Sequence, residues 1–167
     1  MRNKLSFSIG LFGLLLLFGF QNLTAQSPLI LGGYNVKTDE NKEVCVQIYG
    51  RAFEQVLSMQ YSLKWDTKIL KYKGVKSFAL PNLTAQNFGT QDVQKGILTF
   101  AWYDPKLQGI NRTDGTALYE ICFEAVGSPG TNTHIKFVNE PTVIEVSKAP
   151  GILIDLQTEG GKVEVLR

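Results

Sequence analysis

Residues 57–65 carry the clearest pattern in this chain, an alternation of large apolar side chains with smaller or polar ones. Leu57, Met59, Tyr61, Leu63 and Trp65 occupy every second position. Successive side chains of a β-strand point to opposite faces, so a period of two predicts a strand with one buried face. After residue 27, no stretch keeps a helical period for ten residues. The chain is therefore expected to fold as strands.

The same alternation recurs farther along the chain. Further strands are predicted at residues 29–36, 44–49, 70–78, 97–103, 117–125, 134–138, 143–146 and 162–166. Turn-forming pairs such as Asp104-Pro105 and Asp114-Gly115 separate these runs, and the polar stretch 81–89 is expected to be a loop. About nine short strands without intervening helices predict an all-β fold, a two-sheet antiparallel β-sandwich. The predicted core includes Val46, Ile48, Tyr61, Leu63, Leu98, Phe100, Ile121 and Phe123.

The first 25 residues have the layout of a secretory signal peptide. Arg2 and Lys4 precede an uncharged apolar run at residues 9–20, and a small residue, Ala25, follows as a cleavage position. A membrane anchor is the alternative, but this run is shorter than the roughly 20 residues that span a bilayer. We predict cleavage after residues 1–25, a single domain at residues 27–167, no membrane span after cleavage, and a secreted or cell-surface location.

The charge of the chain points away from nucleic acid. Of 17 basic residues, Arg2 and Lys4 lie in the expected signal peptide, which leaves the mature chain balanced against 15 acidic residues. A neutral chain lacks the positive field that attracts nucleic acid or an anionic membrane. Lysines do gather at positions 64, 68, 71, 73 and 76. We interpret them as a solvated strand edge that resists edge-to-edge pairing, with a phosphate-binding patch as the alternative.

Two cysteines share an unusual position in their strands. Cys45 and Cys122 each lie between large apolar residues, so each should face away from the core. Two outward cysteines in an exported protein predict a cross-strand disulfide, although two free thiols remain the alternative. Together with the lone His134 they do not have a zinc-binding spacing, and we expect no metal and no cofactor.

Catalytic motifs are scarce. His134 lies in a strand pattern, and the chain has no Gly-x-Ser-x-Gly nucleophile turn. Asp66, Asp92, Asp104 and Asp114 each lie at a predicted loop, where Asp commonly forms Asx turns. Paired acids for glycoside hydrolysis are not excluded by the sequence, but we expect the chain not to be an enzyme.

Several segments in order resemble a cohesin domain. Residues 43–48 resemble an early family strand of the form VxVPV, and residues 59–66 with Ile69 and Leu70 resemble the signature F-x-L-x-Y-D-P-x-x-L. Residues 96–102 and 114–123 resemble two later strands of the family. Thr67 departs from the pattern, since the family often has Pro after the Asp. The cysteine pair resembles cohesin-like modules of secreted Bacteroidetes-type proteins.

This resemblance implies a nine-stranded jelly roll related to carbohydrate-binding modules. It also implies that one sheet face binds a dockerin, a small domain that carries its own calcium, in complexes that degrade polysaccharides or lie at the cell surface. The alternation then predicts which side chains form this face: Ser58, Gln60, Ser62, Lys64, Ile97, Thr99, Ala101 and Tyr103.

Two other functions stay open. A carbohydrate-binding module would contact polysaccharide directly through a row of exposed aromatic rings, for which Tyr49, Tyr72 and Tyr103 are candidates. A structural module of a surface adhesin would have no ligand of its own. In each case we expect a monomer.

Overall fold

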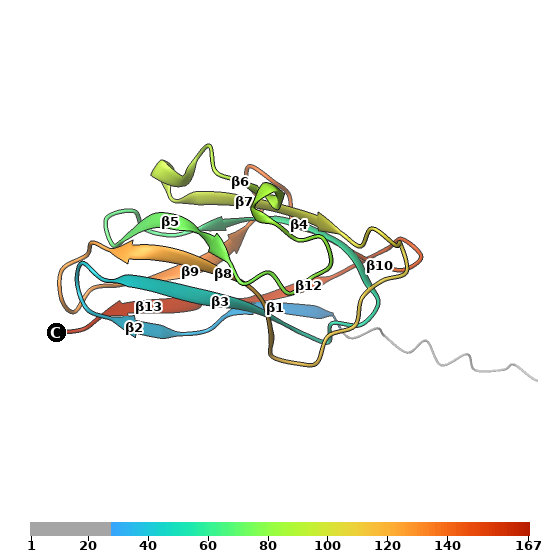
Figure 1. Cartoon of the computed structure of the whole chain (residues 1–167), viewed down its shortest axis with the longest axis horizontal. Helices are drawn as coiled ribbons and strands as arrows, with labels where there is room; N and C mark the ends of the chain where they lie inside the picture. Colours follow the sequence, from blue (N-terminus) through green and yellow to red (C-terminus); the bar gives the residue numbers. More distant parts are fainter. Residues whose placement is uncertain (1–27) are drawn as a thin grey trace, which may run out of the picture.

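The computed structural model describes residues 28–167, and it forms two β-sheets packed face to face. Figure 1 shows the strands of both layers running along the long axis, with strand β1 beginning at one end and the C terminus lying at the other. The predicted signal peptide at residues 1–25 lies outside the described residues. Within residues 28–167, no helix is long and apolar enough to cross a membrane.

The strands are short and follow one another closely. They are β1 (Leu29–Gly33), β2 (Val36–Thr38), β3 (Glu43–Arg51), β4 (Val56–Lys64), β5 (Leu70–Lys76), β6 (Phe88–Gly89), β7 (Ile97–Tyr103), β8 (Thr116–Ala125), β9 (Asn132–Val138), β10 (Glu145–Lys148), β11 (Ile152–Ile154), β12 (Leu156–Glu159) and β13 (Gly161–Val165). Two single-turn 3₁₀ helices, Ala85–Asn87 and Val93–Lys95, lie on either side of β6.

The two sheets divide these strands unequally. The first sheet has the order β12-β1-β3-β8-β5, and the second has the order β11-β10-β4-β9-β13-β2, with β7 and β6 added beside β4. This architecture confirms the predicted β-sandwich. Strand β5 lies at the edge of the first sheet, where Lys71, Lys73 and Lys76 are exposed. The expectation that the lysine run marks a strand edge holds for these three, whereas Lys64 lies in the second sheet.

The N-terminal segment differs from the single strand predicted at residues 29–36. The chain crosses from one sheet to the other at Tyr34 and Asn35, so β1 pairs with β12 and β2 pairs with β13, both in parallel. At this crossing the backbone at Gly33 lies against the backbone at Gly161, so closely that a Cβ atom on Gly33 would be only 2.9 Å from the Cα atom of Gly161. Glycine at both positions supplies the necessary room.

All eight residues predicted for the core are buried, with at most 1% of each side chain exposed. Aromatic rings from both sheets meet there. The ring of Phe100 stacks on Tyr61 at 4.8 Å and on Tyr119 at 5.3 Å between ring centroids. Residues 81–89, predicted as a loop, contribute Leu83 and Phe88 to the same core, and Phe88 begins the short strand β6.

At the start of β4, a β-bulge makes the alternation of buried and exposed residues differ from the one predicted. Ser58 pairs with Ser147 of β10, but Val56 pairs with Lys148, so Leu57 has no partner in the ladder. The extra residue reverses the alternation. Val56 is therefore buried in the core, whereas Leu57, which the alternation placed there, is only half-buried.

The predicted disulfide is present and joins neighbouring antiparallel strands. Cys45 of β3 is directly opposite Cys122 of β8, with 4.0 Å between their Cα atoms. Their neighbours Val44, Val46 and Ile121 point into the core, so the disulfide lies on the outer side of the first sheet.

Candidate functional site

The outer side of the second sheet carries the residues predicted to contact a partner. Here Tyr103 of β7 is paired with Ser58 of β4, Ser58 with Ser147 of β10, and Ser147 with Leu153 of β11. Residues paired across a sheet point to the same side, so these four side chains form a row across four strands. We call this row the binding ridge.

The binding ridge has apolar ends and a small polar centre. The side chains of Tyr103 and Leu153 are 62% and 65% exposed, whereas Ser58 and Ser147 are more covered and their hydroxyl oxygens lie 2.7 Å apart. Neighbouring strands are about 4.8 Å apart, so three strand spacings separate the two apolar ends by roughly 14 Å. An α-helix is about 10–12 Å wide, and one could lie on the serines between Tyr103 and Leu153.

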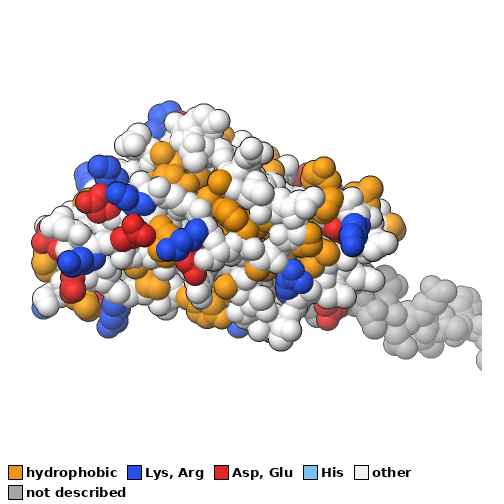
Figure 2. Space-filling view, in the orientation of Figure 1, with side chains coloured by type: hydrophobic (Ala, Val, Ile, Leu, Met, Phe, Trp, Pro, Cys, Tyr) orange, Lys and Arg blue, Asp and Glu red, His pale blue; other side chains and the backbone are white. Residues whose placement is uncertain are grey.

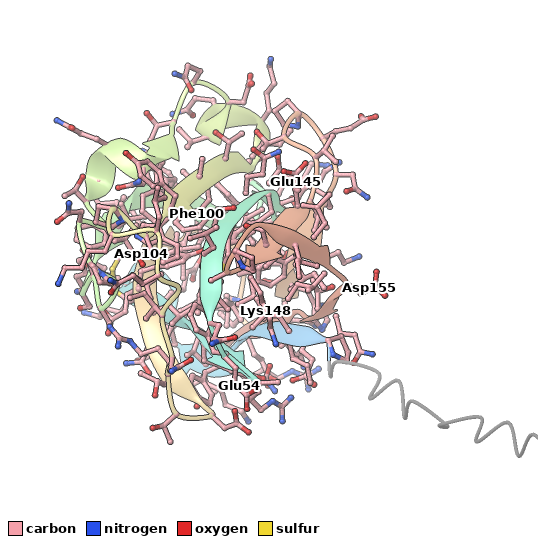
Figure 3. All side chains as sticks on the ribbon, turned by 90° about the vertical axis from the view of Figure 1, so that its right-hand side faces the viewer. Glu54, Phe100, Asp104, Glu145, Lys148 and Asp155 are labelled. Carbon is pink, nitrogen blue, oxygen red and sulfur yellow. A yellow bond between two sulfur atoms is a disulfide. The ribbon has the colours of Figure 1, made fainter. Side chains whose placement is uncertain are left out.

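A second row lies beside the binding ridge. Ala101 of β7 pairs with Gln60 of β4, which pairs with Glu145 of β10. Ala101 and Glu145 are exposed and Gln60 is half-buried. These small and polar side chains continue the low centre of the face. Figure 3 labels Glu145 and Lys148, the first and last residues of β10, in the end-on view.

The rest of the predicted face is interrupted by residues 139–144. Strands β9 and β10 pair with the same edge of β4, one after the other. The chain between them leaves the sheet and crosses its outer face. The Ser62 hydroxyl holds this segment, because it accepts a hydrogen bond from the Thr142 backbone N–H at 2.9 Å and donates to the Thr142 carbonyl at 3.2 Å. We call residues 139–144 the crossing segment.

The crossing segment changes the expected membership of the face. Ser62, predicted to lie on the exposed face, has no exposed surface, and its hydroxyl supports the crossing segment. Thr99 is half-buried and its hydroxyl lies 3.5 Å from the Gly89 carbonyl. Lys64 pairs with Ile97 on the far side of the crossing segment from the binding ridge. The structure thus brings Ser58, Gln60, Ala101 and Tyr103 together and separates them from Lys64 and Ile97. The strand predicted at residues 143–146 begins two residues later, where β10 resumes pairing.

A structured loop follows β7. Asp104 is buried, and its carboxylate accepts hydrogen bonds from the backbone N–H groups of Lys106, Gln108 and Gly109. Burial opposes ionisation, but these three donors and the charge of Lys106 together hold the pKa of Asp104 below its ordinary value. The loop presents Leu107, whose side chain is 66% exposed.

Sequence patterns did not reveal that Leu107 and Leu153 are exposed. Leu107 lies in an irregular loop with a backbone φ of 54°, and Leu153 lies in a strand of three residues. Neither segment is long enough to show an alternation that separates its inner and outer sides. In the space-filling view of Figure 2, hydrophobic side chains gather toward the end of the molecule that carries β10.

The three tyrosines considered for sugar stacking lie apart. Tyr49 is on the first sheet, where its hydroxyl donates to Glu159 at 2.6 Å, and little of its ring is exposed. Tyr72 packs toward the core against Trp65 and Phe123. Tyr103 is on the second sheet. These three rings therefore do not form a planar row.

The groups considered for catalysis or metal binding are also dispersed. His134 is exposed on β9, opposite Lys162. In the part of the chain that the structure describes, one set of three potential metal ligands comes together: Glu43, Cys45 and Cys122. The two sulfur atoms of that set are bonded to each other, so they are not free to bind a metal ion.

Comparisons with known proteins agree with this architecture. No curated protein matches the chain. Among solved structures, the cohesin of a Coh-OlpA–Doc918 complex from Clostridium thermocellum has a TM-score of 0.69 and 18% identity, covering 84% of this chain and 100% of that chain. A Coh-OlpC–Doc435 complex from the same organism gives a TM-score of 0.68 and 21% identity, with 84% and 94% covered.

A third similar structure comes from an archaeon. The non-cellulosomal cohesin of Archaeoglobus fulgidus has a TM-score of 0.66 and 14% identity, with 84% of this chain and 93% of that chain covered. At such identities these structures show a shared fold. The family model described as "Cohesin domain" matches residues 28–152, which include β1 to β10 and most of the face described above. The chain belongs to the cohesin domain family.

Proposed function

We propose that this protein is a non-catalytic binding module that holds a dockerin-type domain on the outer side of its second sheet. Two of the similar structures are cohesins in complex with dockerins, which supports this class of partner. The observation that carries the proposal is the binding ridge. Tyr103 and Leu153 stand on either side of Ser58 and Ser147, at a separation that matches the width of a helix.

The chemistry of the ridge suits a helix with an apolar stripe. Exposed aromatic and aliphatic side chains that become buried supply most of the affinity in protein interfaces. Tyr103, Leu153 and Leu107 are such side chains, and each is more than half exposed. Ser58 lies between Tyr103 and Leu153, and Ala101 lies in the neighbouring row; both are small and let a partner approach the sheet closely. The strands themselves fix the geometry, so little ordering is needed on binding.

The proposal assigns any calcium to the partner. Dockerin-type loops of the form Asp-x-Asn-x-Asp-Gly hold calcium through oxygen ligands, whereas this chain contributes side chains that contact the folded partner. We also propose that binding takes place outside the cell or at its surface, in agreement with the expected export and with the disulfide. One related cohesin is described as non-cellulosomal, so the proposal concerns capture of a protein and does not depend on polysaccharide degradation.

The test is a binding titration with proteins from the same genome that contain paired calcium loops of this form. Calorimetry with purified mature protein should show binding in calcium, and none after a chelator is added. Ala101→Arg should weaken binding strongly, because a long charged side chain would replace a small exposed one beside Tyr103 and Gln60. The matched control is Ala79→Arg, since Ala79 is exposed and its N–H bonds to Leu118 of the first sheet.

Two results would contradict the proposal. If Ala101→Arg binds as tightly as the unmodified protein, the chosen face is wrong. If no calcium-loop protein binds but insoluble polysaccharide retains the module in a pull-down, direct sugar binding replaces the dockerin proposal.

A further inference from the structure

The second sheet has another outer surface, on the far side of the crossing segment. Lys64 of β4 and Lys136 of β9 are directly opposite each other in the ladder between these strands. Both are exposed. Like charges in this position repel each other, so the pairing is unfavourable for the fold alone.

Two hollows adjoin these lysines. The larger has a volume of about 680 Å³ and the smaller about 550 Å³. Lys64 and Lys95 line both of them. The larger hollow is completed by Trp65, Asp66, Thr67, Thr133, His134 and Lys136. Pockets of about 300–1,000 Å³ are typical of small-ligand sites.

The larger hollow carries excess positive charge. Lys64, Lys95 and Lys136 line it, against the single carboxylate of Asp66. One oxygen of that carboxylate already accepts a hydrogen bond from the Lys68 backbone N–H at 2.8 Å. Lys95 pairs with Asp92. Within residues 28–167, no carboxylate lies within 4.0 Å of the ammonium group of Lys64 or Lys136, so neither of these two charges is directly compensated.

Two other lysines on the same sheet are paired with a carboxylate. Lys162 of β13 and Lys37 of β2 both pair with Glu164, at 3.0 and 3.9 Å. The sheet therefore supplies carboxylates beside β13 but leaves the pair on β4 and β9 without one. An anion from solution would fill that role.

We propose that the larger hollow binds a small, hydroxyl-bearing anion, namely an acidic sugar that carries a carboxylate or a sulfate. The ammonium groups of Lys64 and Lys136 hold the acidic group. The side chains of Thr67 and His134 lie in the same hollow and can exchange hydrogen bonds with sugar hydroxyl groups.

The lining distinguishes a sugar from a protein partner. The large hydrophobic side chains that the structure leaves exposed are Tyr34, Tyr103, Leu107, Val126, Val143, Ile152, Leu153 and Leu166, and none of them lines either hollow. Protein interfaces rely on such anchors at their centre. Trp65 also lines the larger hollow, but it is only 4% exposed. A surface that offers charges, hydroxyl groups and an imidazole but no exposed apolar anchor suits a small polar ligand.

The experiment is an NMR titration of the ¹⁵N-labelled mature protein with trigalacturonate. The amide signals of Lys64, Thr67, His134 and Lys136 should move, and binding should weaken as salt is added, because exposed charges are screened. Maltotriose, a neutral trisaccharide, should cause no such shifts. A sulfated disaccharide tests the second acidic group. Sodium sulfate and triglutamate test a bare anion and an acidic peptide.

A matched pair of variants locates the site. Lys136→Gln should raise the dissociation constant for trigalacturonate several-fold, whereas Lys73→Gln on the edge strand β5 of the other sheet should leave it unchanged. Equal affinity in Lys136→Gln, or equal binding of maltotriose, would overturn the proposal. Sodium sulfate or triglutamate binding more tightly than both acidic sugars would also overturn it. None of these results depends on a dockerin, so they are independent of the function proposed above.

Discussion

The hydroxyl groups of Tyr61 and Tyr119 share a hydrogen bond of 2.7 Å in the core, and the two residues come from opposite sheets. Both side chains are completely buried. One hydroxyl donates and the other accepts where water is excluded, and the bond links the sheet that carries the proposed binding face to the sheet that carries the disulfide.

Removal of one member of this pair should be more harmful than removal of both. Tyr61→Phe leaves the Tyr119 hydroxyl buried without a partner, at a cost of about 1–3 kcal/mol in the free energy of unfolding. Adding Tyr119→Phe removes the unsatisfied group and should restore part of that loss. Urea unfolding of the single and double variants measures both values. Additive effects of the two substitutions would show that the hydrogen bond is not important.

The same pair predicts sensitivity to alkali. Burial raises the pKa of both tyrosines, and the neighbouring hydroxyl has opposite effects, lowering the pKa of Tyr61 and raising that of Tyr119. Because the folded-state pKa values are raised, the stabilisation is complete below the unfolded pKa of about 10 and is lost as the pH rises above it. The double Phe variant should therefore lose less stability between pH 9 and pH 11 than the unmodified protein, as followed by circular dichroism. Identical pH profiles would argue against this assignment.

Reduction of the disulfide should weaken the fold substantially. Cys45 and Cys122 close a loop across a sequence separation of 77, which corresponds to about 4 kcal/mol in the chain-entropy model. Guanidinium unfolding with and without a reductant measures this difference, and the Cys45→Ala/Cys122→Ala variant controls for effects of the reductant elsewhere. Two reactive thiols in the unfolded, unreduced protein would contradict the presence of the bond.

The loop after β7 should loosen in acid. The pKa of Asp104 is lowered, so its stabilising effect is present above the unfolded pKa of about 4 and is lost as the pH falls through the folded pKa. Asp104→Asn should have a similar effect at neutral pH, because it removes the charge and one acceptor oxygen. Amide hydrogen exchange should then accelerate at Lys106, Gln108 and Gly109, which donate to Asp104. Exchange that stays unchanged at all three amides would show that the loop is held by other contacts.

The Lys136→Glu variant should have opposite effects on the stability of the fold and on ligand binding in the larger hollow. The substitution replaces a repulsive pair with an attractive one across β4 and β9, and should raise the melting temperature by about 1–3 °C at low salt. It should also abolish binding of acidic sugars. A variant that is less stable than the unmodified protein would indicate that Lys136 has a structural role, and calorimetry of unfolding distinguishes the two.

Much of the fold was predictable because alternation reports directly on burial. Tyr61 and Leu63 were placed in the core by a period of two, and the shared phase of Cys45 and Cys122 predicted their disulfide. The bulge at Leu57 was not predictable, since it depends on the register in which β4 pairs with β10, and β10 lies far away in the sequence. The crossing at Tyr34 was missed because both halves of the segment look like one apolar strand.

The face was predicted less completely than the core. Alternation gives the side of a sheet to which Ser62 points, but it does not report that residues 139–144 cover that side. Contacts such as Ser62 with Thr142 join residues 80 positions apart and leave no local pattern. The row formed by Ser58, Ser147 and Leu153 likewise depends on the pairing of strands far apart in the chain.

The position of the disulfide bears on how this module responds to tension. When the chain is pulled at its two ends, the force passes directly between Cys45 and Cys122, so the 77-residue loop does not extend. Fully stretched, such a loop would add about 250–280 Å. Strands β4 and β7, with Ser58 and Tyr103, lie inside the shielded loop, whereas β10 and β11, with Ser147 and Leu153, lie outside it. A pulled module therefore cannot extend the part of the second sheet that carries Tyr103 and Ser58 while the bond is intact, whereas the part that carries Ser147 and Leu153 is free to unravel.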